Sequence, residues 1–364
     1  MKKLYFYANQ VYQLSYALPF YNKLGGIFVV NSISKYFRFM NHLANMAKFN
    51  DQLLFNTPKV IVRKNGNMLD LEGVILSFSN SIINVNPQEC ALIFHEHGAS
   101  DKRIGSNAKA NPLKKLKNFD YIFLMSPKNL IKIEKLCKTE KDLNILKNKF
   151  IKIENLRFIE YSKKKSDKNK ILSEIGIKNF EKKTVLYAPT WRFGNGTLQK
   201  YFHRFAKEIT KEYNLIVRPH FHEAKLIPQY QIWAFFHNIK NIYFSNPSNL
   251  QKNDTFADFI ASDILLSDNS AVLYEYLITN NPIIIVNPKY NKNVEMPSNL
   301  DIMKNSILFD ETDDITNLID KALQERKFSQ TYEQMFSDCF YQSNQTDVTD
   351  AIKFVANLLQ LPSY

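Results

Sequence analysis

The segment DILLSDNSAVLYEYLITNNPIIIVN, residues 263–287, decides the fold, because it reads as strand, turn, helix and second strand. Its two ends, "DILLS" (263–267) and "PIIIVN" (282–287), are short apolar runs bounded by turn residues. Between them, "AVLYEYLITN" (271–280) has the length and pattern of a helix. Such a unit predicts two parallel strands joined by a crossover helix.

The same alternation extends over both halves of the chain. Further strand-like runs occur at 3–8, 26–30, 60–64, 90–97, 121–126, 184–189, 214–219 and 241–245. Helical runs occur at 11–24, 126–138, 202–213 and 255–262. The sequence therefore predicts an α/β protein with two domains that face each other across a cleft. The stretch "YSKKKSDKNK" (161–170) is the best candidate for the linker between them.

Length and composition exclude several classes of protein. With 364 residues, 45% of them hydrophobic, the chain can bury the cores of two domains and is not intrinsically disordered. Its three cysteines, Cys90, Cys137 and Cys339, lie too far apart for a disulfide framework or a structural zinc site. The N-terminus lacks the apolar core of a signal peptide, and no run approaches 18 apolar residues. We therefore expect a cytoplasmic protein that does not span a membrane.

The net charge of +13 indicates either that the protein binds polyanions or that its surface is simply lysine-rich and solvated. Lysines concentrate at 109–119, 132–153 and 161–170. Phosphate-bearing substrates and an anionic membrane surface are both candidate partners. No nucleic-acid-binding signature accompanies the charge, so nucleic acid is not expected as a partner.

Ligands of parallel sheets bind outside the carboxyl ends of the strands, so the polar residues there are the candidate site. The strand at 263–267 runs through Ser267, Asp268, Asn269 and Ser270 into a helix. Asp268, Asn269 and Ser270 suit the start of a helix, whose N–H groups could bind phosphate beside the Ser270 hydroxyl. Glu275 follows where it could accept hydrogen bonds from a ribose. An ordinary capped turn would give the same pattern.

Two other strand ends carry arginine and histidine. "VLYAPTWRFG" delivers Thr190 and Arg192 into a loop, and "LIVRPHFHE" delivers Arg218, His220 and His222. Arginine suits bidentate contact with phosphate, although each of these residues could also be ordinary surface polarity.

The stretch "FHEHGAS" (94–100) places His95 and His97 on one face of a strand and Glu96 on the other. An H-x-H pair can bind metal, but the carboxylate pattern of metal sites is missing. A divalent metal therefore stays open but is not indicated, and we name no metal ligands. The glycine after His97 favours that histidine as the reactive one.

These motifs, in this order, resemble the CDP-glycerol glycerophosphotransferase family of teichoic-acid primases and polymerases. The letters "LYAPTWR" (186–192) match its signature in full, and "RPH" (218–220) matches a strand end of the family. "HGASDKRIG" (97–105) corresponds to its H-G-T-P-L-K-K-L-G motif, and "SDNSAVLYEYLITNNPIII" (267–285) to its D-Y-S-S phosphate loop. The resemblance covers about residues 85–345, and residues 1–85 carry no recognised motif.

The resemblance implies a GT-B-like fold of two Rossmann-like domains. We expect an acceptor-side domain at 1–160, a nucleotide-donor domain at 161–345, and a helix at 346–364 that packs back toward the first domain. The implied reaction moves a polyol phosphate, glycerol phosphate by default, from a CDP-activated donor to an acceptor hydroxyl and releases CMP.

The resemblance also implies roles for individual residues. His97 matches the proposed general base and His220 a second histidine at the phosphates. The implied substrate-binding residues are Gly98, Thr190, Arg192, Arg218, Ser267, Asp268, Asn269, Ser270 and Glu275. No cofactor is implied with certainty.

Two departures from the family pattern leave the donor open. Ala99-Ser100-Asp101 replaces T-P-L, and Ala271 replaces the second serine of the phosphate loop. A GT-B glycosyltransferase that uses nucleotide sugars is one alternative, and a non-catalytic basic module that binds membranes or polyanions is another. The implied acceptor is a cell-surface polymer or a lipid-linked molecule, which would place the enzyme peripherally on the inner face of the membrane.

Overall fold

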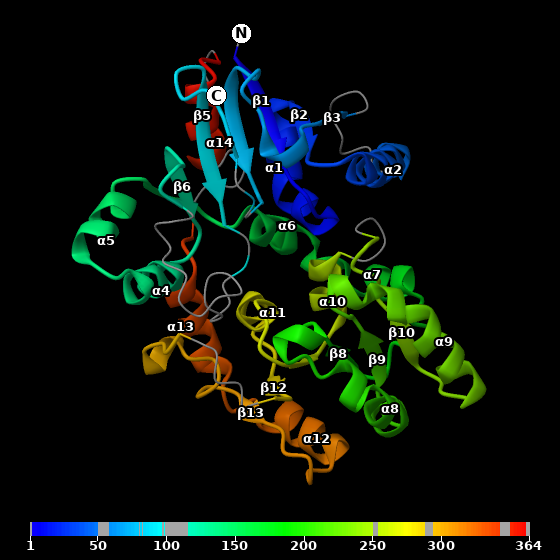
Figure 1. The fold of residues 1–364 in the computed structure, drawn as a ribbon. Coiled ribbons are helices and arrows are strands. Elements are labelled where there is room, and N and C mark those ends of the chain that lie inside the picture. The colour runs from blue at the N-terminus through cyan, green and yellow to red at the C-terminus, as the bar shows by residue number, and fades with distance from the viewer. Residues whose placement is uncertain are drawn as a thin grey trace. The chain divides into compact units, whose positions relative to one another are not determined.

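The computed structural model describes residues 2–49, 58–79, 81, 83–96, 98, 116–249, 254–287, 294–342 and 350–361. It divides the chain into two compact units (Figure 1). Of the described residues, the first unit holds those up to Glu96, 116–157 and 340–361, and the second holds Gly98 and 158–339. The boundaries at 157/158 and 339/340 lie close to the expected ones at 160/161 and 345/346.

The first unit is built on a parallel sheet, seven-stranded among the described residues, in the order β3-β2-β1-β4-β5-β6-β7. Its strands are β1 (Lys3–Tyr7), β2 (Ile27–Val30), β3 (Lys59–Val62), β4 (Gly73–Ser77), β5 (Cys90–His95), β6 (Tyr121–Leu124) and β7 (Phe150–Lys152). Its helices are η1 (Val11–Gln13), α1 (Leu14–Leu24), α2 (Ile33–Phe49), η2 (Lys64–Gly66), α4 (Pro127–Leu136), α5 (Glu140–Lys147) and α14 (Asp350–Leu358). The C-terminal helix α14 packs against α1.

The second unit is built on a parallel sheet that, over the described residues, has six strands in the order β10-β9-β8-β11-β12-β13. The strands are β8 (Thr184–Tyr187), β9 (Asn214–Val217), β10 (Ile242–Phe244), β11 (Ile264–Ser267), β12 (Ile283–Ile285) and β13 (Ile307–Leu308). The helices include η3 (Lys165–Asp167), α7 (Lys168–Ile175), η4 (Arg192–Gly194), α8 (Leu198–Ile209), η5 (Phe221–Leu226), α9 (Ile227–Phe236), α10 (Thr255–Ala261), α11 (Val272–Glu275), η6 (Tyr276–Thr279), η7 (Ser298–Leu300), α12 (Ile315–Glu325) and α13 (Ser329–Cys339).

Both sheets have the strand order of a Rossmann fold, in which the order reverses beside the first strand. The α/β prediction with two Rossmann-like domains is therefore confirmed. The candidate linker at 161–170 is helical, formed by the end of α6 (Leu156–Lys164), by η3 and by the start of α7, and the division between the units falls just before it, at 157/158. Its lysines are tolerated there because they lie on the exposed side of these short helices.

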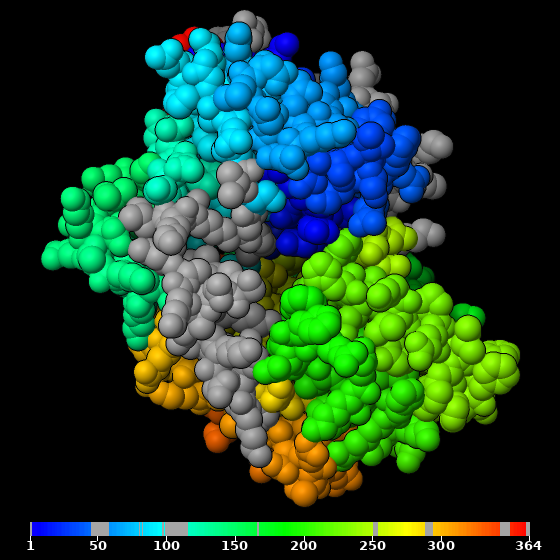
Figure 2. Space-filling view, viewed as in Figure 1, coloured from blue at the N-terminus to red at the C-terminus, as the bar shows by residue number. Residues whose placement is uncertain are grey.

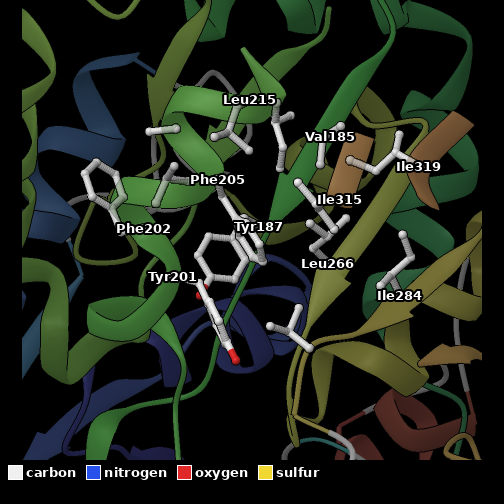
Figure 3. Packing of buried hydrophobic residues seen from close by; sticks show 14 of the residues in the cluster. Val185, Tyr187, Tyr201, Phe202, Phe205, Leu215, Leu266, Ile284, Ile315 and Ile319 are labelled. Atoms are coloured by element: carbon white, nitrogen blue, oxygen red, sulfur yellow. The ribbon is translucent and has the colours of Figure 1, made fainter. Parts of the chain in front are cut away.

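The core of the second unit shows why its sequence folds in this way. Strand residues such as Val185, Leu215 and Leu266 are fully buried, as expected of parallel strands covered on both faces. Figure 3 shows them packed against Phe202 and Phe205 of α8, and against residues of α12. Helices α10 and α11 lie near β8 and β11. This packing fixes the strand ends from which the candidate site projects.

Candidate functional site

The candidate site in the second unit begins at the place where the strand order reverses, between β8 and β11. Parallel sheets open a crevice here, and the loops after the two strands form its walls. The loop after β8 contains the "APTWR" letters, and the turn after β11 contains Ser267 to Ser270. The two most specific motifs of the sequence therefore meet at one point of the fold.

Asp268 joins these two loops by hydrogen bonds. The backbone N–H of Thr190 donates to its Oδ1 atom at 2.6 Å, and the N–H and hydroxyl of Thr197 both donate to Oδ2 at 2.9 Å. Ser267 adds a hydrogen bond from its hydroxyl to the carbonyl oxygen of Ala188 at 2.7 Å. All four of these polar residues are buried. Asp268 thus fixes the course of the 188–197 loop, a role that its position in the sequence did not reveal.

The loop turns tightly at Gly196. A Cβ atom at this position would lie 1.9 Å from the carbonyl oxygen of Thr190, so only glycine fits. Arg192 stands at the exposed tip of the loop, with its guanidinium carbon 5.9 Å from the ring centroid of Phe193. Arg192, which was predicted to bind ligand, therefore has a fixed backbone and an exposed side chain.

A cavity of about 400 Å³ lies beside this loop. Its lining comes from the loops after β8, β12 and β13 and from the first turn of α8, and comprises Arg192, Asn195, Gly196, Thr197, Lys200, Tyr201, Val286, Asn287, Phe309, Asp310 and Glu311. Lys200 and Glu311 form an ion pair across one side of it. The cavity is large enough for a small phosphorylated molecule.

His220 lies against the same loop through aromatic contacts. Its ring is stacked on Trp191 with centroids 6.1 Å apart, and His222 lies 5.0 Å from Trp191 and 5.2 Å from His220. The Nδ1 atom of His220 accepts a hydrogen bond from the backbone N–H of His222 at 3.3 Å. The structure thus brings together Arg192 and His220, two of the residues predicted from separate motifs.

Glu223 is a buried carboxylate in this region that the sequence reasoning missed. Its Oε1 atom accepts a hydrogen bond from the backbone N–H of Arg192 at 3.2 Å. Burial raises the pKa of the Glu223 carboxyl, and the hydrogen bond and charge of Arg192 partly oppose that rise. Its position three residues after His220, at the same strand end, was the signal that could have identified it.

Arg218 lies in a different environment from Arg192. It is buried, and its Nη1 atom lies 2.8 Å from Oδ2 of buried Asp258 and 2.7 Å from Oγ of Ser245. Its Nη2 atom donates to the hydroxyl of Thr255 at 2.8 Å. These contacts connect the end of β9 to α10. Arg218 thus has a structural role, and its direct contact with phosphate stays a prediction.

The turn after β11 leads into α11, which has only four residues before η6 continues the chain. Asn269 is buried and Ser270 is half-buried, with the Ser270 hydroxyl accepting a hydrogen bond from the N–H of Val272 at 3.4 Å. Glu275 is buried at the end of α11.

Gly98 approaches this short helix within the second unit. A Cβ atom at Gly98 would come 2.8 Å from Cβ of Ala271 and 3.8 Å from Oε1 of Glu275, and its φ of +79° also favours glycine. Ala271 is the position where the sequence departs from the family's serine. Gly98 and Glu275, both predicted as substrate-binding, therefore lie near one another.

His97, the predicted general base, lies outside the described residues, as does most of the 109–119 lysine cluster. His95 is buried among aromatic rings, with its ring centroid 4.9 Å from that of Phe78, and its Nδ1 atom lies 2.5 Å from the carbonyl oxygen of Glu96. His95 is thus a core residue.

Two groups of polar residues in the first unit were missed. At the end of β5, Glu96 accepts a hydrogen bond from Nδ2 of Asn129 at 3.0 Å. Burial raises the pKa of its carboxyl, and the charge of Lys132 opposes this. Lys128, also on α4, is fully buried. The letters "SPKN" directly after β6 were the available signal.

The second group lies at the reversal point of the first sheet, between β1 and β4. Asn9 donates from Nδ2 to the hydroxyl of Ser79 at 3.1 Å, and its backbone N–H donates to Oε1 of Gln13 at 2.7 Å. All three side chains are buried. The "ANQ" letters (8–10) after the first strand could have identified Asn9. Residues 1–85 thus hold a polar cluster at the edge where ligands of such sheets bind.

Within the described part of the chain, no group of three or more histidine, cysteine, aspartate or glutamate residues is arranged to hold a metal ion. A search of the same residues for a helix that is long and apolar enough to cross a bilayer also finds none.

The chain is similar to known proteins in sequence and in fold. The chain is 28% identical over 140 residues to the teichoic acid poly(glycerol phosphate) polymerase of Bacillus spizizenii, a match that spans 36% of this chain and 32% of that protein. Among solved structures, the wall teichoic acid polymerase TagF superposes with a TM-score of 0.65 at 16% identity, covering 98% of this chain and 88% of that one. The structure of a TagF variant soaked with CDPG superposes with a TM-score of 0.63 at 16% identity, covering 98% of this chain and 87% of that one.

Because the sequence identity to TagF is low, this comparison supports the fold only. The family model described as CDP-glycerol:poly(glycerophosphate) glycerophosphotransferase matches residues 22–354, which is most of the chain. That match includes the "LYAPTWR" loop and the turn joined to it by Asp268. The chain therefore belongs to the CDP-glycerol:poly(glycerophosphate) glycerophosphotransferase family.

Proposed function

We propose that the protein transfers glycerol phosphate from CDP-glycerol to a hydroxyl of a cell-surface polymer of the teichoic-acid or capsule type, with release of CMP. The observation that carries the proposal is the family match over residues 22–354, which contains both loops at the reversal point of the second sheet. Arg192 lies at the exposed tip of one loop, and His220 stacks on the neighbouring Trp191. Both side chains suit contact with phosphate.

In the proposed reaction, His97 takes the proton of the acceptor hydroxyl as its oxygen attacks the β-phosphorus of the donor. The new P–O bond joins glycerol phosphate to the acceptor, and the bond to CMP breaks with its electron pair leaving on CMP. An imidazole with an ordinary pKa near 6.5 suits this step at neutral pH. Arg192, His220 and the 267–270 turn stabilise the charge on the phosphoryl oxygens and on CMP.

The acceptor is proposed to be a polymer linked to lipid, and the enzyme to work at the inner face of the membrane. The net charge of +13 supports this, because it favours contact with anionic surfaces. Glu275 is buried beside Gly98 and is placed in our proposal near the ribose of the donor.

The test is a donor panel of CDP-glycerol, CDP-ribitol and UDP-glucose, with release of CMP or UDP measured and the products weighed by mass spectrometry. We expect CMP release with CDP-glycerol and a product heavier by glycerol phosphate. His97→Ala should lower turnover at least roughly 100-fold while donor binding persists, whereas His237→Ala, at an exposed histidine elsewhere in the chain, should leave turnover unchanged.

Three results would overturn the proposal. Turnover of UDP-glucose alone would show a glycosyltransferase. Salt-sensitive binding to polyanions with no turnover of any donor would show a non-catalytic module. Full activity of His97→Ala would remove the assigned base.

A further inference from the structure

Helix α9 presents an apolar face to solvent. Ile232, Phe235 and Phe236 are 58%, 80% and 77% exposed, and their spacing puts them on one side of the helix. The opposite side, with Tyr230 and Ala234, is buried against the core of the second unit. Figure 2 shows the yellow-green atoms of this part of the chain at the surface of that unit. Contiguous exposed apolar side chains of this size mark a contact surface.

The charges around this face are positive. α9 itself, "IPQYQIWAFF", contains no charged residue, and residues 224–249 contain Lys225 and Lys240 but no aspartate or glutamate. Both lysines are exposed.

Helix α8 packs beside α9 and adds to this charge. Its Lys207 amine lies 5.7 Å from the ring centroid of Trp233 on α9. The acidic Glu208 of α8 is neutralised by an ion pair with Arg204 at 3.0 Å. Lys207, Lys225 and Lys240 form no ion pair with any residue that the structure describes, so this part of the surface carries net positive charge.

This combination distinguishes between the partners that could cover the face. A second copy of the chain would place the same lysines opposite each other, and residues 224–249 offer no acid to compensate them. An anionic bilayer supplies the opposite charge to the lysines and an apolar interior to the phenylalanines. Aromatic and aliphatic side chains bordered by lysines are typical of surfaces that lie on a membrane.

We propose that the exposed face of α9 is a membrane-contact surface that inserts Ile232, Phe235 and Phe236 into the headgroup region of an anionic bilayer. Lys225 and Lys240 then lie at the level of the anionic headgroups. Three apolar side chains and a few lysines give reversible binding rather than permanent anchoring. The contact rests on the proposed function, since a lipid-linked acceptor gives it a purpose, but it can be measured without turnover.

The experiment is flotation of the full chain with vesicles of phosphatidylcholine and phosphatidylglycerol (3:1), compared with vesicles of phosphatidylcholine alone. We expect binding to the anionic vesicles that weakens as salt is raised. The double variant Phe235→Ser/Phe236→Ser should bind at least roughly tenfold more weakly. Lys225→Gln/Lys240→Gln should lose roughly tenfold on anionic vesicles only.

The matched control is Phe180→Ser, which removes a phenylalanine that is 47% exposed outside α9 in the same unit. It should bind vesicles as the wild type does. Unchanged tryptophan fluorescence and CDP-glycerol binding confirm that each variant is folded.

Two outcomes would overturn the membrane contact. One is wild-type vesicle binding by Phe235→Ser/Phe236→Ser. The other is that this variant changes only in sedimentation, from the dimer of the wild type to a monomer, which would identify the partner as a second copy of the chain. Absence of CMP release with vesicle binding intact would instead count against the proposed function and leave the α9 surface standing.

Discussion

Replacing Asp268 by asparagine tests whether this carboxylate holds the two motif loops together. The carboxylate is fully buried and, from residues that the structure describes, accepts three hydrogen bonds, two from backbone N–H groups and one from a hydroxyl. Asparagine keeps one acceptor oxygen and puts an NH₂ group where the other stood. In either orientation of the amide, at least one donor of Thr190 or Thr197 loses its acceptor and faces another donor.

The size of the effect follows from these contacts. A hydrogen bond to a buried charged group contributes about 1.5–3 kcal/mol, and a buried donor without a partner costs about 1–3 kcal/mol. We therefore expect Asp268→Asn to lower the free energy of unfolding of the second unit by about 2–4 kcal/mol. With a typical urea dependence, the unfolding midpoint should fall by about 1–2 M.

The sequence supplies a convenient probe for this measurement. Its two tryptophans, Trp191 and Trp233, both lie in the second unit, so tryptophan fluorescence during urea unfolding reports on that unit. Because the loop carries Arg192, the variant should also bind CDP-glycerol at least roughly tenfold more weakly by calorimetry, equivalent to about 1.4 kcal/mol.

Asp263→Asn is the matched control. Asp263 also accepts a backbone hydrogen bond, from Thr184 at 2.8 Å, and pairs with Lys168 at 2.9 Å. It lies at the amino ends of β8 and β11, opposite to the loops. It should lose stability but keep donor binding. The reasoning is refuted if Asp268→Asn unfolds at the wild-type midpoint, or if Asp263→Asn weakens donor binding as strongly as Asp268→Asn does.

Two further predictions concern Gly98 and Glu223. Gly98→Ala should lower turnover at least roughly tenfold, because the added Cβ would lie 2.8 Å from Cβ of Ala271 on a backbone with positive φ. Partial recovery of turnover in Gly98→Ala/Ala271→Gly would separate the clash from the φ strain, and unchanged turnover of Gly98→Ala would contradict the prediction. For Glu223, burial raises the pKa of the carboxyl above its ordinary value of 4.5, so the native state binds the proton more tightly than the unfolded chain does. The contribution of this group to stability is therefore fully present below pH 4.5 and is lost as pH rises through the folded pKa. Glu223→Gln should not show this loss. The urea midpoint of the variant minus that of the wild type should therefore be larger at pH 8 than at pH 5. An equal difference at both pH values would count against a buried carboxylate charge at Glu223.

Much of the fold was predictable because its strands are short apolar runs between turn residues. The runs at 184–189, 214–219 and 263–267 correspond to β8, β9 and β11. β4, β7 and β13 were missed for physical reasons. β4 is a five-residue apolar run that periodicity cannot distinguish from a helix segment, β7 lies among lysines, and β13 has two residues whose pairing depends on β12.

The site was predictable where a polar residue follows an apolar strand, and much less so where its role depends on which way the side chain points. Arg192 and Arg218 both come after apolar strands, yet Arg192 is exposed and the guanidinium of Arg218 is buried against Asp258. Asp258 comes from a helix 40 residues later, and no local pattern links the two. Asp268 likewise was predicted as a ligand-binding residue, whereas its carboxylate binds backbone groups 71 and 78 residues away.

The hydrogen bonds of Asp268 have a consequence for how this protein can be re-engineered. The 188–197 loop, which turns tightly at Gly196, is joined to the 267–270 turn through one acceptor, so neither segment can be exchanged alone. A chimera that takes its "APTWRFGNGT" segment from a relative with a different loop length would leave the aspartate facing the wrong amides. The two segments are therefore best transplanted as a matched pair, with the intervening strands and helices left in place.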